Sequence, residues 1–289
     1  MPIPESQLES WSHQGAVTTA KNTHESIRNA LQQSERLKSK NFEVYLQGSY
    51  KNGTNIRGDS DVDIVVQLNS AFHSNLSNEQ KQIFGFTAAT YGWNEFREDV
   101  LRALRDYYGR DKVREGRKSL KVQTSYLPAD VVVCIQYRKY PPFPRNANDY
   151  VEGMTFYVPS ENRWVVNYPK LHYENGVKKQ SRTNDWYKKT VRLFKNARTY
   201  LVDSGKISRD LAPSYFLECL LYNVPDNMFG GSFQNTFYNV VDWFSRANLG
   251  QFVCQNEQMC LFGNSPEQWS EDKTRQFIRA MINLWNNWR

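Results

Sequence analysis

A small-residue turn followed by two nearby carboxylates is the feature that most constrains the fold and chemistry of this chain. Gly48-Ser49 comes about a dozen residues before Asp61-Val62-Asp63. Apolar residues alternate with others on both flanks, which predicts a β-strand before the turn and a second strand after Asp61. The alternating residues are Val44, Leu46, Val62, Ile64, Val66 and Leu68. Asp61 and Asp63 therefore share one strand face, with Cα atoms about 6.6 Å apart.

The turn and the carboxylate pair together predict a site for a metal ion and a nucleotide. Two carboxylates at this spacing repel each other, and one or two Mg²⁺ ions between them would remove that penalty. Gly48 lets a phosphate approach the main chain, and the Ser49 hydroxyl and nearby N–H groups can donate to phosphate oxygens. Either feature alone is more typical of an ordinary turn. Their combination between two strands favours the site.

A third carboxylate, Asp130, is the candidate that would complete a two-metal site. It opens a predicted buried strand over residues 129–135, and residues 118–123 are predicted to form the strand before it. Taken alone, Asp130 is more typical of a surface turn that leads into a strand.

A predicted amphipathic helix over residues 186–202 presents basic side chains on a different face from its apolar ones. The basic residues are Lys188, Arg192 and Lys195. Such a face is usually solvated, but the carboxylates upstream make a triphosphate its natural partner, with Lys195 the best candidate. Ser214 follows Pro213 at a predicted helix start, where it can cap the helix, bind an anion, or do both.

These residues resemble a known superfamily. The spacing of Gly48-Ser49, Asp61-x-Asp63 and Asp130 is similar to that of the polymerase-β-like nucleotidyltransferases. The full string from Gly48 to Asp63 resembles the bacterial cGAS/DncV-like nucleotidyltransferases (CD-NTases), closest to the clade that contains cyclic UMP-AMP synthases. That family makes cyclic oligonucleotide second messengers in CBASS-type antiphage defence. The resemblance covers roughly residues 40 to 222.

The resemblance implies a role for each candidate. Asp61 and Asp63 would bridge two Mg²⁺ ions, for which Mn²⁺ may substitute, and Asp130 would complete the site at the ion that activates the attacking ribose hydroxyl. Further residues would bind the NTP substrates: Gly48, Ser49, Lys195 and Ser214 at the donor triphosphate, and Tyr215 stacked on a base. The implied reaction joins NTPs and closes the product into a cyclic dinucleotide or trinucleotide.

Base choice is predicted from a segment similar to one that lies near the nucleotide bases in the bacterial proteins. The matching residues are Trp164, Pro169 and His172. Asn167-Tyr168 stands where many relatives carry Thr-Asn or Thr-Ser, and an amide matches a pyrimidine edge because it donates and accepts together. Asn167 thus predicts a pyrimidine NTP beside ATP. The alternative is that Asn167 only satisfies the backbone of a turn before Pro169.

Composition is consistent with a cytoplasmic enzyme. The chain of 289 residues has no run of about 18 apolar residues, and its N-terminus lacks the pattern of a signal peptide. The four cysteines show no Cys-x-x-Cys spacing, so we expect free thiols. The net charge of +7 permits binding to polyanions, but a triphosphate site also accounts for it. We expect no activation by nucleic acid and no membrane binding, and the family's regulatory or effector proteins are the candidate protein partners.

The expected fold is α+β, with a polymerase-β-like sheet lobe packed against a helical lobe and the active site in the cleft. We expect the catalytic lobe, with an N-terminal helix within residues 5–40 and a helix near 79–107, to span residues 1–185. A helical lobe over 186–289 would pack with it as one unit. Two alternatives remain open: a linear or small-molecule nucleotidyltransferase, and a non-catalytic nucleic-acid-binding module. The three aspartates argue against the second.

Overall fold

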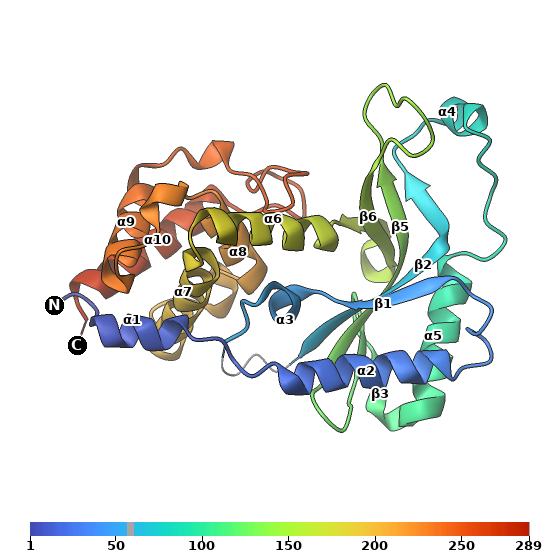
Figure 1. Cartoon of the computed structure of the whole chain (residues 1–289), viewed down its shortest axis with the longest axis horizontal. Helices are drawn as coiled ribbons and strands as arrows, with labels where there is room; N and C mark the ends of the chain where they lie inside the picture. Colours follow the sequence, from blue (N-terminus) through green and yellow to red (C-terminus); the bar gives the residue numbers. More distant parts are fainter. Residues whose placement is uncertain (57–60, 289) are drawn as a thin grey trace. The chain divides into compact units, whose positions relative to one another are not determined.

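A computed structural model describes residues 1–56 and 61–288 (Figure 1). Within them, seven strands form one mixed sheet in the order β1-β2-β5-β4-β3, and β6 and β7 extend it from β5. The pairing of β2 with β5 is parallel and the other named pairs are antiparallel. The strands are β1 (Phe42–Leu46), β2 (Val62–Ser74), β3 (Val113–Glu115), β4 (Leu120–Val122), β5 (Ala129–Lys139), β6 (Val151–Val158) and β7 (Arg163–Asn167).

Ten α-helices are assigned in the described part of the chain. They are α1 (Glu5–Ser12), α2 (Thr18–Gln32), α3 (Gly48–Asn52), α4 (Asn78–Ile83), α5 (Trp93–Tyr108), α6 (Pro169–Arg182), α7 (Trp186–Asp203), α8 (Ser214–Tyr222), α9 (Phe233–Arg246) and α10 (Glu271–Asn286). Short 3₁₀ turns are η1 (Arg110–Lys112), η2 (Pro159–Glu161), η3 (Arg209–Leu211), η4 (Asp226–Met228) and η5 (Leu249–Gln251). None of these helices combines the length and apolarity needed to cross a membrane.

The chain forms two compact units, and their limits differ from the predicted boundary at residue 185. The sheet unit comprises Ala16–Tyr50 and residues 61–170, and the helical unit comprises Met1–Gly15, residues 51–56 and residues 171–288. The segment 51–56 therefore groups with the helices, although it lies between two segments of the sheet unit in the sequence.

The sheet unit is built on the alternation that the sequence predicts. Val62, Ile64, Val66 and Leu68 of β2 are fully buried, whereas Asp63 between them is half-buried. Helices α2 and α5 pack against each other and against the sheet (Figure 1). Each fully buried aliphatic side chain of this core contributes roughly 1.5 to 3 kcal/mol. The core therefore fixes the strand on which Asp63 is mounted.

The helical unit has its own apolar core, formed by α1 and α7 to α10. Its fully buried aromatic side chains include Tyr187, Phe194, Phe216, Phe237, Phe244 and Phe277. The four cysteines of the chain are free thiols, as expected, and Cys260 is the exposed one.

Two of the predicted helices are each divided in the structure. The single helix expected within residues 5–40 is two helices, α1 and α2, which belong to different units. The helix expected near residues 79–107 is α4 and α5. Gly85, with φ +69°, follows α4 in a left-handed conformation that ends a helix. Gly92 then starts α5, where its N–H donates to Glu95.

Candidate active site

Three carboxylates lie at the same end of two neighbouring strands. Asp63 on β2 and Asp130 on β5 are direct partners in the parallel ladder. Asp61 precedes β2 by one residue and is exposed. Parallel strands begin at the same sheet edge and lie about 4.8 Å apart, so the side chains of Asp63 and Asp130 are neighbours. The structure thus makes neighbours of Asp63 and Asp130 and puts Asp61 just before the start of the same strand as Asp63.

The turn before β2 lies against this carboxylate pair. Gly48 has φ +65°, and a Cβ added to it would lie 2.2 Å from Oδ2 of Asp63. The N–H of Gln47 donates to the Asp63 carbonyl oxygen at 2.9 Å. Only glycine permits both the left-handed backbone and this close approach. Ser49 follows Gly48 as the second residue of α3.

Lys121, which was not among the residues predicted from the sequence, forms an ion pair with Asp130. Lys121 of β4 is the antiparallel partner of Asp130, and its Nζ lies 3.1 Å from Oδ1 of that carboxylate. The hydrogen bond and charge of Asp130 raise the pKa of Lys121, and Asp61 and Asp63 add to the effect. The alternation of residues 118–123 was the available signal, because it puts Lys121 on the face of Asp130.

The donor set fits a hard divalent cation. All three side chains offer carboxylate oxygens, which Mg²⁺ prefers. Among the described residues, no three His, Cys, Asp or Glu side chains are already gathered as a ligand cluster. Asp130 is held instead by Lys121. The ammonium group of Lys121 offsets the charge of Asp130 beside the other carboxylates.

A cavity of about 550 Å³ opens beside these carboxylates. Three acidic side chains line it, which are Asp61, Asp111 and Asp130, together with three basic ones, which are Lys112, Arg114 and Lys121. A cavity with cations on its wall and carboxylates at its edge is suited to a phosphate chain that arrives with a metal ion.

Asn167 lies on the same face of the sheet as the carboxylates. Asp130 and Gln136 are six residues apart on β5, so their side chains share a face. Gln136 is paired with Met154 of β6, and Met154 with Asn167 of β7. Directly paired residues project to the same side. The half-buried Asn167 therefore lies three strand spacings across this face from the strand of Asp63.

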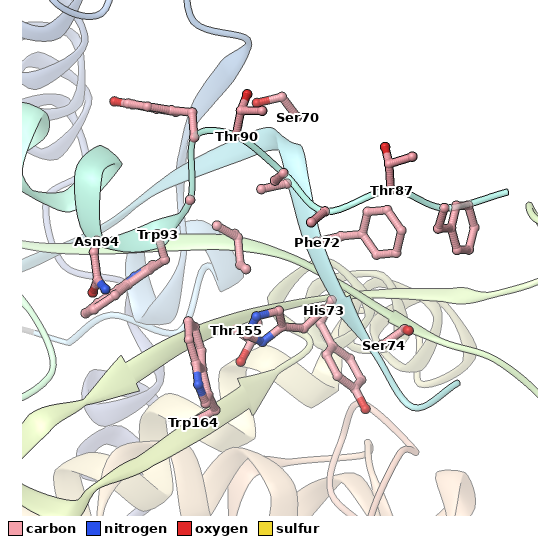
Figure 2. Close-up of a pocket in the computed structure, with 18 of the residues that line it drawn as sticks. Ser70, Phe72, His73, Ser74, Thr87, Thr90, Trp93, Asn94, Thr155 and Trp164 are labelled. Atoms are coloured by element: carbon pink, nitrogen blue, oxygen red, sulfur yellow. The ribbon is translucent and has the colours of Figure 1, made fainter. Parts of the chain in front are cut away.

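Trp164 projects from the opposite face. It is three residues before Asn167 on β7, and its ring lies 4.2 Å from that of His73 and 5.6 Å from that of Trp93 (centroid distances). Figure 2 shows the three rings around a second cavity, of about 1070 Å³. His73 pairs with Tyr137, which is seven residues beyond Asp130 on β5, about 23 Å along that strand. Within the segment that resembles the base-binding region, Asn167 shares the carboxylate face and Trp164 does not.

Two of the three basic side chains predicted to share a face of helix α7 are buried in the structure, and Lys188 is half-buried. Lys195 is 0% exposed and Arg192 is 9% exposed. Lys195 Nζ donates to Oε1 of Glu218 at 2.8 Å and to the Thr54 carbonyl oxygen at 3.1 Å. Arg192 donates to the carbonyl oxygens of Ser12 and Gly53. Buried acceptors draw both side chains inward, and the role of Lys195 at the triphosphate stays a prediction.

Ser214 is the first residue of α8 and does not cap it, because Pro213 occupies the N-cap position. Its hydroxyl accepts a hydrogen bond from Arg198 at 3.3 Å. The ring of Tyr215 is 42% exposed and lies nearly parallel to His172 and Trp269, at centroid distances of 4.9 and 5.9 Å. The contacts of Ser214 and Tyr215 with substrate stay predictions.

Comparison with known proteins places the whole chain in one family. Residues 12–179 match the family of Second Messenger Oligonucleotide or Dinucleotide Synthetase domains. Residues 174–286 match the cGAS/DncV-like nucleotidyltransferase C-terminal helical domain. Together the two matches cover both the sheet and the helices.

The relatives are cyclic nucleotide synthases. The chain is 68% identical, over 288 residues, to a cyclic UMP-AMP synthase of Rhodothermus marinus, an alignment that spans 100% of this chain and 99% of the relative. It is 41% identical to the cyclic nucleotide synthase CdnE01 of Staphylococcus haemolyticus over 100% of both chains. The structure of the Rhodothermus marinus CdnE c-UMP-AMP synthase with Apcpp and Upnpp matches with a TM-score of 0.97 over 99% of this chain and 98% of that chain, at 67% identity.

These matches confirm the polymerase-β-like α+β fold and the class of enzyme expected from the sequence. The chain belongs to the cGAS/DncV-like nucleotidyltransferases, and it is a nucleotidyltransferase of the kind that makes cyclic oligonucleotides.

Proposed function

We propose that this enzyme joins UTP and ATP into a cyclic dinucleotide, with Asp61, Asp63 and Asp130 as the carboxylates of its active site. The observation that carries the proposal is the pairing of Asp63 with Asp130, with Gly48 packed against Asp63. The base assignment is supported by the 68% identity to a cyclic UMP-AMP synthase.

Divalent metal ions are the cofactors general to this family, and we assign two Mg²⁺ ions to the three carboxylates, with Mn²⁺ as a substitute. When bound, such ions lower the pKa of the attacking hydroxyl and neutralise the departing pyrophosphate. The residues of the chain contribute position and charge. Asp63 and Asp130 hold neighbouring places on rigid strands, and Gly48-Ser49 presents main-chain N–H groups and a hydroxyl to the donor triphosphate. Lys195 and Ser214 are the candidates from the helical unit.

Asn167 is proposed to read the pyrimidine base. Its amide donates one hydrogen bond and accepts another, which matches the edge of uracil. Its position on the carboxylate face of the sheet is compatible with that task. A site built on such bonds discriminates strongly against a base that leaves one of them unmade.

We also propose that the protein acts in the cytoplasm, in CBASS-type antiphage defence, where the cyclic product would signal to effector proteins. Nucleic acid is not part of this proposal, because NTP substrates account for the basic side chains that line the cavity beside the carboxylates.

The test is a product assay with purified protein, Mg²⁺ and each pair of labelled NTPs, read by mass and by resistance to phosphatase and exonuclease. A resistant product that contains one UMP and one AMP is expected. Asp63→Asn should be inactive, whereas Asp106→Asn, an exposed aspartate on α5, should retain activity. A product that phosphatase degrades would assign a linear polymerase instead.

A further inference from the structure

The side chain of Glu218 collects hydrogen bonds from four other side chains deep in the helical unit. Oε1 accepts from Thr54 Oγ1 at 2.7 Å and from Lys195 Nζ at 2.8 Å. Oε2 accepts from Asn52 Nδ2 at 2.8 Å and lies 2.8 Å from His172 Nε2. The Glu218 side chain is only 4% exposed. A buried carboxylate with this many donors is fully satisfied and holds each donor in place.

The donors come from segments far apart in the sequence. Asn52 ends α3, Thr54 follows it, His172 lies on α6 and Lys195 on α7. Two of these donors, His172 and Lys195, also belong to the segments that resemble the family. One buried group therefore explains why the stretch after Ser49 contains both an amide and a hydroxyl.

The segment from Asn52 to Ile56 is anchored along its length. Asn52, Thr54, Asn55 and Ile56 are all less than 10% exposed. The carbonyl oxygen of Gly53 accepts from Arg192, and the side chain of Asn55 accepts from Gln14 at 2.8 Å. Irregular segments normally run over the surface, so burial of this one requires that partners satisfy its polar groups. Glu218 supplies the carboxylate that accepts from both Asn52 and Thr54.

Charge reinforces the anchoring. Burial alone would raise the pKa of Glu218, but the charge of Lys195 and the hydrogen bond with His172 outweigh burial and hold the pKa well below its usual range. The carboxylate is therefore ionised whenever the protein is folded at neutral pH. Removal of that charge would leave Lys195, which is 0% exposed, without a counter-ion.

We propose that Glu218 is a positioning residue of the nucleotidyl transfer reaction. It fixes the segment 52–56, whose first residue ends the short helix α3 that also carries Ser49, and thereby limits the positions that this donor-binding serine can take. This inference rests on the proposed active site. A group held in one geometry gains rate through orientation, and a displacement of about 1 Å can cost about 100-fold.

The helical unit offers a matched control. Lys179 is a second buried lysine, with a side chain 4% exposed, and its Nζ lies 2.6 Å from Oδ1 of Asp226. Asp226 pairs with Lys179 and Arg182, neither of which contacts segment 52–56 in the hydrogen bonds and ion pairs described for this part of the chain. Asp226→Asn therefore breaks the ion pair of another buried lysine in the same unit, at a carboxylate that is 35% exposed against 4% for Glu218, and it leaves the partners of segment 52–56 in place.

Thr54→Val is the decisive variant, because it removes one donor from the anchored segment and keeps the ion pair between Lys195 and Glu218. Hydrogen exchange of peptides within residues 49–56 should accelerate at least tenfold, and kcat should fall about tenfold to 100-fold with a smaller change in KM. Thr54→Ser, which keeps the hydroxyl, should show the wild-type exchange rate and the wild-type kcat. Glu218→Gln should show the same pattern in a stronger form. Asp226→Asn should lower the melting temperature and leave both the exchange of 49–56 and kcat unchanged.

The inference would be overturned if Thr54→Val left both the hydrogen exchange of residues 49–56 and kcat unchanged. It would also be overturned if Asp226→Asn changed both quantities as much as Thr54→Val does. The exchange measurement separates this result from failure of the proposed site, because it needs no turnover. If Asp63→Asn is inactive while Thr54→Val exchanges as the wild type does, the anchoring is wrong and the site stands. If Asp63→Asn stays active, the site is wrong, and the exchange data still decide the anchoring.

Discussion

Asp63 and Asp130 are direct partners in the parallel pairing of β2 with β5. The two residues are far apart in the sequence, yet their strands begin at the same edge of the sheet. Parallel pairing makes this possible, because it brings like ends of strands together. A rigid core behind β2 then keeps the two carboxylates as neighbours without help from a loop.

Replacing either of the first two carboxylates should abolish synthesis without unfolding the protein. Asp61 is exposed and Asp63 is half-buried, so Asp61→Ala and Asp63→Asn remove charge from positions outside the core. A carboxylate that would bridge two ions affects both the attack by the ribose hydroxyl and the departure of pyrophosphate. Mass spectrometry of the reaction products, with circular dichroism as the folding check, measures this. Product at the wild-type level from folded protein would remove these aspartates from the site.

Gly48→Ala should inactivate the enzyme through the Asp63 carboxylate. The new Cβ would lie 2.2 Å from Oδ2 of Asp63, and φ +65° is strained for any residue with a side chain. The left-handed conformation alone costs about 1 to 2 kcal/mol. We expect a modest loss in the free energy of unfolding and a loss of more than about 100-fold in kcat/KM, since the carboxylate must move. Gly85→Ala, where the added Cβ meets nothing within 4 Å, controls for the backbone strain.

The strands and the three aspartates were predictable because they depend on local patterns. Alternation over residues 62–68 fixed which side chains face the core, and this also fixed the face of Asp63. The environment of Lys195 was not predictable in this way. Helical periodicity separates one face from another, but it does not say whether a polar face meets water or a buried carboxylate. Glu218 lies 23 residues from Lys195 and 166 residues from Asn52, so only the folded chain reveals the contacts.

Lys195→Met should destabilise the protein because it leaves Glu218 buried without its ammonium partner. Breaking one side of a buried pair commonly costs about 3 to 5 kcal/mol. Denaturant unfolding should show this loss, and the double variant Lys195→Met with Glu218→Gln should lose less than the sum of the single variants. Calorimetric titration of the folded variant with a nonhydrolysable NTP and Mg²⁺ then tests the triphosphate role. Unchanged NTP affinity would leave Lys195 a structural residue.

The same carboxylate predicts an acid-sensitive fold. The folded-state pKa of Glu218 is lowered relative to the unfolded value of about 4.3, so its contribution to stability is complete above that value. The contribution is lost as pH falls below about 4.3 toward the folded-state pKa, because the unfolded chain takes up the proton first. The free energy of unfolding, measured from pH 7 to pH 3, should therefore fall less steeply in Glu218→Gln than in the wild type. Parallel curves would contradict this.

Asn167→Ser should change which base the enzyme incorporates. The register from β5 through β6 puts Asn167 on the face of Asp63 and Asp130, which is the face where a nucleotide held by the carboxylates would lie. Serine offers one hydroxyl in place of an amide, and the site can then no longer donate and accept together at the uracil edge. In reactions with mixed NTPs we expect the ratio of UMP to AMP in the product to fall by at least about tenfold, while total turnover is reduced less. Asn94→Ser is the matched control, because Asn94 lines the cavity around Trp164 and not the carboxylate face (Figure 2). If the product of Asn167→Ser keeps the wild-type composition while activity persists, Asn167 does no more than satisfy the backbone before Pro169.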